Sequence, residues 1–352
     1  MKVLKFGGTS VGSAQRMKEV AKLITDGERK IVVLSAMSGT TNTLVEISDY
    51  LYKKNPEGAN EIINKLESKY RQHIDELFAT PEYKQKGLEL IKSHFDYIRS
   101  YTKDLFTLFE EKVVLAQGEL ISTAMMNYYL QECGVKSVLL PALEYMRTDK
   151  NAEPDPVYIK DKLQVQLELH PDAEIYITQG YICRNAYGEI DNLQRGGSDY
   201  TASLIGAAIN ASEIQIWTDI DGMHNNDPRI VDKTAPVRHL HFEEAAELAY
   251  FGAKILHPTC IQPAKYANIP VRLLNTMDPT APGTLISNDT EKGKIKAVAA
   301  KDNITAIKIK SSRMLLAHGF LRKVFEIFES YQTSIDMICT CLLYTSPSPR
   351  DS

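Results

Sequence analysis

The chain has 352 residues, of which 43% are hydrophobic and 24% charged, which predicts a full core in one large domain with a smaller companion. A formal net charge of -4 without a long basic run argues against nucleic acid as a partner. No run of about eighteen apolar residues occurs, and Met1 leads directly into a strand-like VLKF, so we expect no membrane contact and a cytoplasmic location.

The first predicted elements are a buried strand and a helix, joined by a glycine turn. Val3 to Phe6 has the pattern of the strand, and GGTS at 7–10 separates it from apolar residues at helical spacing. Lys5 stands where its ammonium could reach a phosphate held by the backbone of Gly7 and Gly8. The alternative is that Lys5 is a solvated edge residue. No GK[ST] follows the glycines, so the turn is not a P-loop.

A second buried strand, at Ile31 to Leu34, opens into the loop SAMSGTTN. Ligands bind at the carboxyl ends of parallel strands in open α/β sheets, which makes Ser35 and Thr41 candidates for ligand contact. The charged chain from about 43 to 112 has helical period, interrupted near 55–58 and 80–81. This segment is predicted to be a helical insertion. An appendage that only packs against the domain is a simpler interpretation than a lid over the site.

A helix, two strands and a hairpin turn are predicted next. Gly118-Glu119 is expected to begin the helix, where a glutamate by itself only complements the helix dipole. The strands are expected at Val138 to Leu140 and at Glu174 to Tyr181, and the hairpin turn at Arg184 to Asp191.

The stretch LQRGGSDYTASLIGAAIN, from Leu193 to Asn210, has the residue types of an anion-binding turn before an apolar helix. Its two glycines allow close approach of a ligand, Arg195 offers a bidentate cation, and Asp199 can pair with an ammonium group. The alternative is a Gly-rich turn that is merely capped by Ser198 or Asp199. The helix itself is predicted for residues 201–211.

Strands and helices continue to alternate up to residue 288. Thr218-Asp219 and the loop DIDGMHNNDPR follow a predicted strand, and their polar side chains suit a nucleotide and its metal ion. This rhythm predicts a mostly parallel sheet with helices on both faces. The remaining predictions are strands at Ile214 to Trp217, Val271 to Leu274 and Gly283 to Ile286, and a helix at Glu243 to Phe251.

The histidines and cysteines indicate no metal centre. His224, His239 and His241 are close in sequence, but no spacing joins them to a metal, and we propose no zinc and no metal ligands. The five cysteines show no paired metal spacing, so reduced thiols are expected.

Several short motifs stand in order over about the first 290 residues: KFGGTS at 5–10, SAMSGTTN at 35–42, GE at 118–119, ITQGYI at 177–182, RGGSDYTA at 195–202, WTDIDG at 217–222, DPR at 227–229 and FGAKILHP at 251–258. Together they resemble aspartate kinase of the amino-acid kinase superfamily. The resemblance implies a three-layer α/β/α sandwich with a mostly parallel sheet. It also implies transfer of the ATP γ-phosphoryl group to the β-carboxylate of L-aspartate, the first step of lysine, threonine and methionine biosynthesis.

The resemblance also implies roles for individual residues. Lys5 and Asp199 are the implied catalytic residues. Aspartate carries two carboxylates and one ammonium, which call for a bidentate cation and an anion; the implied substrate contacts are Ser35, Thr41, Glu119, Arg195 and Ser198. Phosphoryl transfer calls for positioning and charge neutralisation, with ATP and Mg²⁺; the implied nucleotide contacts are Lys5, Gly7, Gly8, Thr218, Asp219, His224, Arg229, Lys254 and Ile255. His224 stands where many relatives place a tyrosine, which leaves its role open.

Two other functions are compatible with the sequence. Glutamate, acetylglutamate, carbamate and uridylate kinases share the superfamily fold, although the pairing of Glu119 with Arg195 favours an amino-acid substrate. A catalytically silent amino-acid sensor belongs to a different class, and the presence of Lys5 and Lys254 argues against it.

The chain after the kinase-like region, 1–288, is predicted as a linker at 289–302 and a partial regulatory domain at 303–340. Strand-like alternation, an apolar helix face and a second strand start resemble the opening of an ACT domain of the ferredoxin-like α+β type. The Ser- and Pro-rich tail 341–352 is expected to be foreign or disordered, in a chain truncated within the ACT region. The open strand edge is expected to favour association, and the family implies a homodimer. The implied effector contacts are Met314, Gly319, Phe320, Leu321, Ser334 and Asp336.

Overall fold

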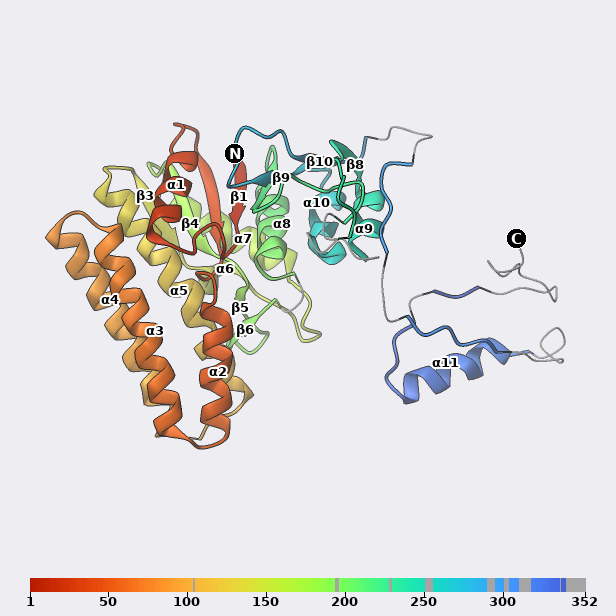
Figure 1. The fold of residues 1–352 in the computed structure, drawn as a ribbon, viewed down its shortest axis with the longest axis horizontal. Coiled ribbons are helices and arrows are strands. Elements are labelled where there is room, and N and C mark those ends of the chain that lie inside the picture. The colour runs from red at the N-terminus through yellow and green to blue at the C-terminus, as the bar shows by residue number, and fades with distance from the viewer. Residues whose placement is uncertain are drawn as a thin grey trace. The chain divides into compact units, whose positions relative to one another are not determined.

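The structure is a computed structural model in which the chain divides into two compact units, Met1–Lys301 and Asp302–Ser352 (Figure 1). The two units are described separately. No described helix is long and apolar enough to cross a membrane. The residues that the structure describes are 1–103, 105–193, 196–227, 230–250, 256–289, 295–300, 304–309, 318–335 and 337–339.

An eight-stranded sheet forms the centre of the first unit. Its strands are β1 (Lys2–Phe6), β2 (Lys30–Leu34), β3 (Ser137–Leu140), β4 (Ile175–Gln179), β7 (Ile214–Thr218), β8 (His239–His241), β9 (Val271–Asn275) and β10 (Thr284–Ser287). They lie in the order β3-β4-β2-β1-β7-β9-β10-β8, and only the β9/β10 pair is antiparallel. All strands predicted up to residue 288 are confirmed, while β8 was not predicted. The hairpin prediction is also confirmed, because β5 (Ile182–Arg184) and β6 (Ile190–Asn192) form an antiparallel pair.

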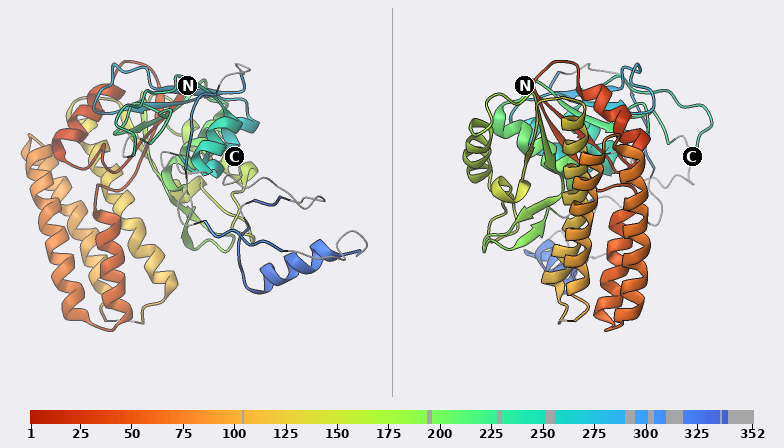
Figure 2. Two further views of the ribbon diagram at one scale, coloured as in Figure 1. Left: turned by 45° about the vertical axis from the view of Figure 1, so that its right-hand side comes forward. Right: turned by 90° about the vertical axis from the view of Figure 1, so that its left-hand side faces the viewer.

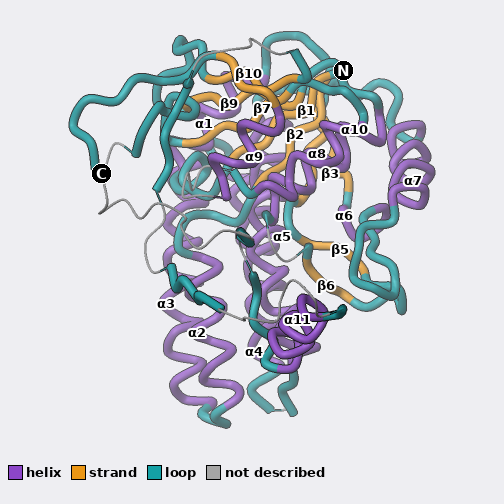
Figure 3. Tube along the Cα trace, turned by 90° about the vertical axis from the view of Figure 1, so that its right-hand side faces the viewer, coloured by secondary structure: helices purple, strands orange, loops and turns teal. Residues whose placement is uncertain are grey.

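Helices cover both faces of this sheet, which confirms the three-layer α/β/α prediction (Figures 2 and 3). Alternate residues of the central strands face opposite layers, so that Leu4 and Phe6 pack on one side and Val3 on the other. One layer contains α1 (Ala14–Ile24), α2 (Thr40–Tyr52), α3 (Pro56–Leu77), α4 (Pro81–Ser100) and α5 (Leu108–Glu132). The other contains α6 (Ala142–Tyr145), α7 (Pro156–Glu168), α8 (Gly197–Ile209), α9 (Phe242–Tyr250), the 3₁₀ helix η1 (Pro258–Ile261) and α10 (Gln262–Tyr266).

Helices α2 to α5 form a bundle that extends away from the sheet and is called the helical lobe below (Figure 1). The two predicted interruptions fall where helices begin. Asn55 caps α3 by accepting a hydrogen bond from the Gly58 amide, and Pro56 and Pro81 occupy the first turns of α3 and α4. Thr107 and Glu110 form a capping box at the start of α5.

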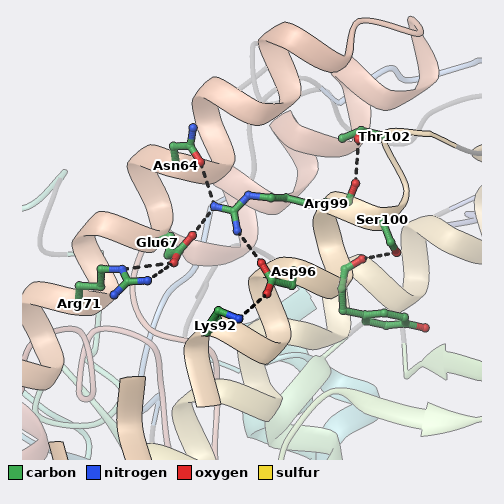
Figure 4. A network of polar contacts seen from close by, with 9 residues as sticks. Asn64, Glu67, Arg71, Lys92, Asp96, Arg99, Ser100 and Thr102 are labelled. Carbon is green, nitrogen blue, oxygen red and sulfur yellow. Dashed lines mark hydrogen bonds and ion pairs between the residues drawn. The ribbon is translucent and has the colours of Figure 1, made fainter. Parts of the chain in front are cut away.

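A network of charged side chains joins α3 to α4 inside the helical lobe (Figure 4). Glu67 on α3 accepts hydrogen bonds from Arg71, one turn later, and from Arg99 on α4. Arg99 also donates to Asp96 at 3.1 Å and to Asn64 at 2.9 Å. Glu67 is only 7% exposed, so its partners compensate a buried charge.

The prediction that Gly118-Glu119 begins a helix is wrong. Both residues lie in the middle of α5, which already begins at Leu108. Gly118 is explained by packing against the loop after β2, because a Cβ at this position would stand 2.8 Å from the Ala36 Cβ. Glu119 is therefore too far from the helix start to stabilise the helix dipole, so the dipole does not explain why a carboxylate is buried at this position.

The second unit contains one described helix, α11 (Phe320–Ser330), at the position of the predicted apolar helix. The predicted strands are not found in the described residues 304–309 and 333–335, which form no ladder. A strand needs a hydrogen-bonded neighbour to persist, and alternation alone does not supply one. None of the residues of α11 is buried.

Candidate active site

The carboxyl ends of the parallel strands β1, β2, β4 and β7 meet at one edge of the sheet, where the predicted site residues gather. Lys5 Nζ on β1 lies 2.8 Å from Asp199 Oδ1 in the first turn of α8. Both side chains are mostly buried, at 11% and 16% exposure. Lys5 also lies over the glycine turn, because a Cβ on Gly7 would stand 3.4 Å from its Nζ.

The start of α8 is built from glycine and carries no side-chain cap. Gly196 is the N-cap residue with φ +88°, and a Cβ there would stand 1.9 Å from the Cys260 Sγ, so only glycine fits. The alternative in which Ser198 or Asp199 caps this turn is therefore wrong. Asp199 faces Lys5, and Ser198 accepts a hydrogen bond from the Ser35 hydroxyl at 2.8 Å.

Ser35 connects three elements at this edge. Besides its contact with Ser198, its backbone carbonyl accepts a hydrogen bond from the Ser122 hydroxyl of α5 at 2.9 Å. The end of β4 approaches just as closely, because a Cβ on Gly180 would stand 2.2 Å from the Ser198 Oγ. The loop after β2, the helix α5 and the start of α8 thus form one packed wall.

Glu119 contributes an incompletely satisfied carboxylate to this wall. It is 4% exposed, and its Oε1 accepts a hydrogen bond from the Ala36 amide at 3.2 Å. Its Oε2 is buried and has no hydrogen-bond partner among the described residues. Burial raises the pKa of Glu119 to about 7, against the smaller opposing effect of the Ala36 amide. An unpaired buried carboxylate oxygen is costly unless a cation or donor reaches it.

The predicted nucleotide contacts on described residues lie farther along the same edge. Gly8 adjoins the loop after β2, because a Cβ there would stand 2.8 Å from the Ala36 carbonyl oxygen. Thr218 ends β7 and hydrogen-bonds to Ile220, while the adjacent Asp219 is exposed. Thr218 and Asp219 stand at the end of the strand next to β1, where Trp217 is opposite Phe6, so they lie beside the glycine turn.

Two predicted residues are not drawn into the wall. Thr41 is exposed in the first turn of α2. His224 Nδ1 lies 2.8 Å from the Thr234 hydroxyl, and its backbone forms an isolated bridge with Pro236. These contacts indicate that His224 stabilises the loop in which it lies. Four further predicted site residues lie outside the described residues: Arg195, Arg229, Lys254 and Ile255.

Sequence reasoning missed Tyr181, which is separated from the end of β4 by Gly180. Its φ is +68°, a left-handed value that is uncommon for a bulky side chain. The amide of Tyr181 donates to the Thr201 hydroxyl at 3.0 Å, and its ring lies 3.5 Å from the position of a Cβ on Gly197. Burial, followed by the nearby carboxylate of Glu119, raises its pKa to about 12. The preceding glycine was the only sequence signal for this strained position.

The chain matches known proteins over most of its length. Residues 1–275 match the amino acid kinase family. The chain is 38% identical over 350 residues to Aspartokinase 1, chloroplastic, of Arabidopsis thaliana, covering 96% of this chain and 61% of that protein. It is 34% identical over 343 residues to the lysine-sensitive aspartokinase 3 of Escherichia coli K12, covering 96% and 76%. The chain spans 61% to 64% of the length of the three chloroplastic aspartokinases it matches.

Solved structures show the same likeness. The structure is similar to that of E. coli aspartokinase III in complex with aspartate and ADP, with a TM-score of 0.82 and 32% sequence identity. The match covers 97% of this chain and 76% of that one. The complex of the same enzyme with lysine and aspartate gives a TM-score of 0.76.

Proposed function

Because the chain belongs to the amino acid kinase family, and within it to the aspartokinases, we propose that it transfers the γ-phosphoryl group of ATP to the β-carboxylate of L-aspartate. The product is 4-phospho-L-aspartate. One observation carries the proposal: Glu119 has a buried carboxylate oxygen with no partner among the described residues, and it lies in the same packed wall as Asp199, which pairs with Lys5. A substrate with both an ammonium group and a carboxylate suits such a wall.

The acceptor end of the site is assigned to the wall around Glu119. The α-ammonium of aspartate supplies a cation for Glu119 Oε2, which has no partner within the described part of the chain. Hydroxyl groups of Ser35, Ser198 and Thr41 are proposed to contact the substrate carboxylates, with Arg195 as the bidentate cation that the family resemblance implies. The substrate thereby brings its β-carboxylate towards Lys5.

The transfer needs no general base from the protein. The β-carboxylate has an ordinary pKa of about 3.9 and is ionised at neutral pH. One of its oxygens bonds to the γ-phosphorus as the bond from that phosphorus to the β,γ-bridging oxygen breaks, and ADP leaves with that electron pair. Lys5 neutralises the charge on the transferring group, and Asp199 holds the ammonium of Lys5 in place.

The nucleotide is assigned to the glycine turn and the loop after β7. Gly7 and Gly8 let the phosphates approach the backbone, and Thr218, Asp219, Arg229, Lys254 and Ile255 are the proposed further contacts. Mg²⁺ bound with ATP supplies neutralisation of phosphate charge. The residues present fit this ion, because kinase Mg²⁺ is held by one or two carboxylates together with substrate phosphates, and Asp219 is an exposed carboxylate at this edge.

The test is ATP-dependent formation of acyl hydroxamate from L-aspartate in the presence of hydroxylamine. We expect product with L-aspartate and none with L-glutamate. Lys5→Ala is expected to lower turnover by about a thousandfold or more, because the charge it neutralises develops in the transition state. Lys2→Ala is the matched control on the same strand, since the Lys2 side chain is partly exposed and pairs with Glu28. Aspartate binding without any turnover would instead indicate a silent sensor.

The second unit is assigned a regulatory role of the ACT type, and Gly319, Phe320, Leu321 and Ser334 are proposed effector contacts. Met314 and Asp336 lie outside the described residues. Since α11 buries no residue, we expect this 352-residue chain to show no cooperative inhibition. Activity measured with and without millimolar lysine or threonine tests this, and clear cooperative inhibition would contradict it. The cytoplasmic location and the homodimer remain predictions.

A further inference from the structure

One helix of the helical lobe contacts both loops that form the candidate site. On α3, Lys69 Nζ donates to the backbone carbonyl of Ser38, in the loop after β2, at 3.2 Å. His73 Nδ1 lies 3.0 Å from the Lys69 carbonyl oxygen of its own helix, and Nε2 lies 3.3 Å from the backbone carbonyl oxygen of Gly12, in the turn after β1. The tautomer with its hydrogen on Nε2 donates to Gly12. Residues four apart share one helix face, so α3 presents both side chains to the loops together.

The two loops also interlock with each other. The Ser38 amide donates to the Gly8 carbonyl at 3.1 Å. A Cβ on Gly12 would stand 3.0 Å from both the Gly8 carbonyl oxygen and the Ser38 Cβ. With so little free space, a shift of Ser38 moves the glycine turn that follows Lys5. A contact that fixes the loop after β2 therefore also fixes the glycine turn after β1.

Helix α3 is itself held firmly. Glu67 ties it to α4 through Arg99, as shown in Figure 4. The hydroxyl of the fully buried Tyr70 lies 2.9 Å from the Thr40 Oγ1 at the start of α2. Lys69 is exposed, and no ion pair of its ammonium is found within the described part of the chain. Its hydrogen bond thus goes to the loop rather than to a neighbouring carboxylate.

We propose that Lys69 and His73 are positioning residues of the active site. Lys69 fixes the loop that carries Ser35, and His73 fixes the turn next to Lys5. The inference rests on the proposed aspartate kinase reaction. It gives α3, which lies in the insertion predicted at about 43–112, a role in supporting the site, in place of the packing appendage expected from the sequence.

The first test is the variant Lys69→Met, which keeps the aliphatic stem and removes the donor. The aspartate KM is expected to rise about fivefold, the effect of one hydrogen bond, while the ATP KM stays within about twofold. Lys69→Arg, which retains a donor, is expected to restore the aspartate KM. Lys65→Met is the matched control one turn earlier on α3, where the lysine is exposed and pairs with Glu61.

The second variant separates the two side chains. His73→Leu is expected to lower kcat about fivefold rather than to raise the aspartate KM, because the turn that it supports adjoins Lys5. Gln72→Leu is its control, since Gln72 is exposed and bonds only within its own helix to Glu76 among the described residues. Equal kcat values in the two variants would remove His73 from the proposal.

Hydrogen exchange gives a readout that does not depend on catalysis. In Lys69→Met, the amide of Ser38 is expected to exchange about five times faster than in Lys65→Met. If the wild-type chain does not phosphorylate aspartate, the proposed function fails, and the exchange rates alone decide the positioning role. Unchanged exchange in Lys69→Met would overturn the inference. Faster exchange with an unchanged aspartate KM in an active chain would also overturn it.

Discussion

Glu119 at the candidate site and Glu67 at the contact between α3 and α4 are both buried, and the two carboxyl groups behave in opposite ways. Glu119 is 4% exposed and Glu67 is 7% exposed, so burial is nearly the same. Burial raises the pKa of Glu119 to about 7. Burial also acts to raise the pKa of Glu67, but hydrogen bonds from Arg99 and Arg71 outweigh it and lower this pKa.

The difference between the two regions lies in their partners. Glu67 is paired within its own protein, as expected for a carboxylate that joins two helices. Glu119 has one backbone donor and one oxygen without a partner in the described residues. A paired buried charge indicates a structural role, whereas an unpaired one indicates that a ligand completes the site.

Of the changes that test this comparison, replacement of Glu119 should have the largest effect. Glu119→Gln is expected to raise the aspartate KM about thirtyfold or more, because a hydrogen bond to a charged group contributes about 2 kcal/mol or more. The same substitution at the paired position, Glu67→Gln, is the control and should leave the aspartate KM within about twofold. Steady-state kinetics with varied aspartate measure both. Equal aspartate KM values in the two variants would contradict the proposal that Glu119 binds the substrate and Glu67 does not.

The pH dependence of aspartate binding should follow the raised pKa of Glu119. Below about pH 7 this carboxyl is protonated and cannot pair with the substrate ammonium, so the aspartate KM is expected to rise up to about tenfold per pH unit as pH falls. Above pH 7 the aspartate KM should become independent of pH. Aspartate KM values between pH 5.5 and 8.5 give the profile. The rise should disappear in Glu119→Gln, and a flat wild-type profile would show that ionised Glu119 is not required.

The sequence predicted the layered fold because its signals are local. The short apolar runs of β1 and β2 and the helical spacing in α1 need only neighbouring residues. The approach of Lys5 to the start of α8 was also foreseeable, because Lys5 stands just before one recognisable glycine turn and Asp199 just after another. In these places local pattern and tertiary structure agree.

The environment of Glu119 could not be predicted, because it depends on contacts between distant segments. Its oxygen meets the amide of Ala36, and the adjacent Gly118 packs on the same residue. A helix start was expected at this point, since a glycine followed by a glutamate looks like a terminus when the tertiary contact is unknown. The roles of Lys69 and His73 escaped for the same reason, because a charged helix face looks solvated until the loops beside it are placed.

The smallest effect is expected on stability, in the helical lobe. Glu67→Gln should lower the free energy of unfolding by about 1 to 2 kcal/mol, less than for a fully buried pair, because Arg71 is 48% and Arg99 28% exposed and solvent screens them. A lowered pKa adds stability above the unfolded value of about 4.3, which is lost as pH falls through the folded pKa. The difference in the free energy of unfolding between wild type and Glu67→Gln, measured in urea, should therefore be full at pH 7 and shrink towards pH 3.

Lys92→Gln, at the 70% exposed rim of the same network, should change the free energy of unfolding by less than about 0.5 kcal/mol. A loss at position 67 no larger than at position 92 would mean that the paired glutamate contributes no more than a surface charge, and that Arg99 does not fix α3 against α4.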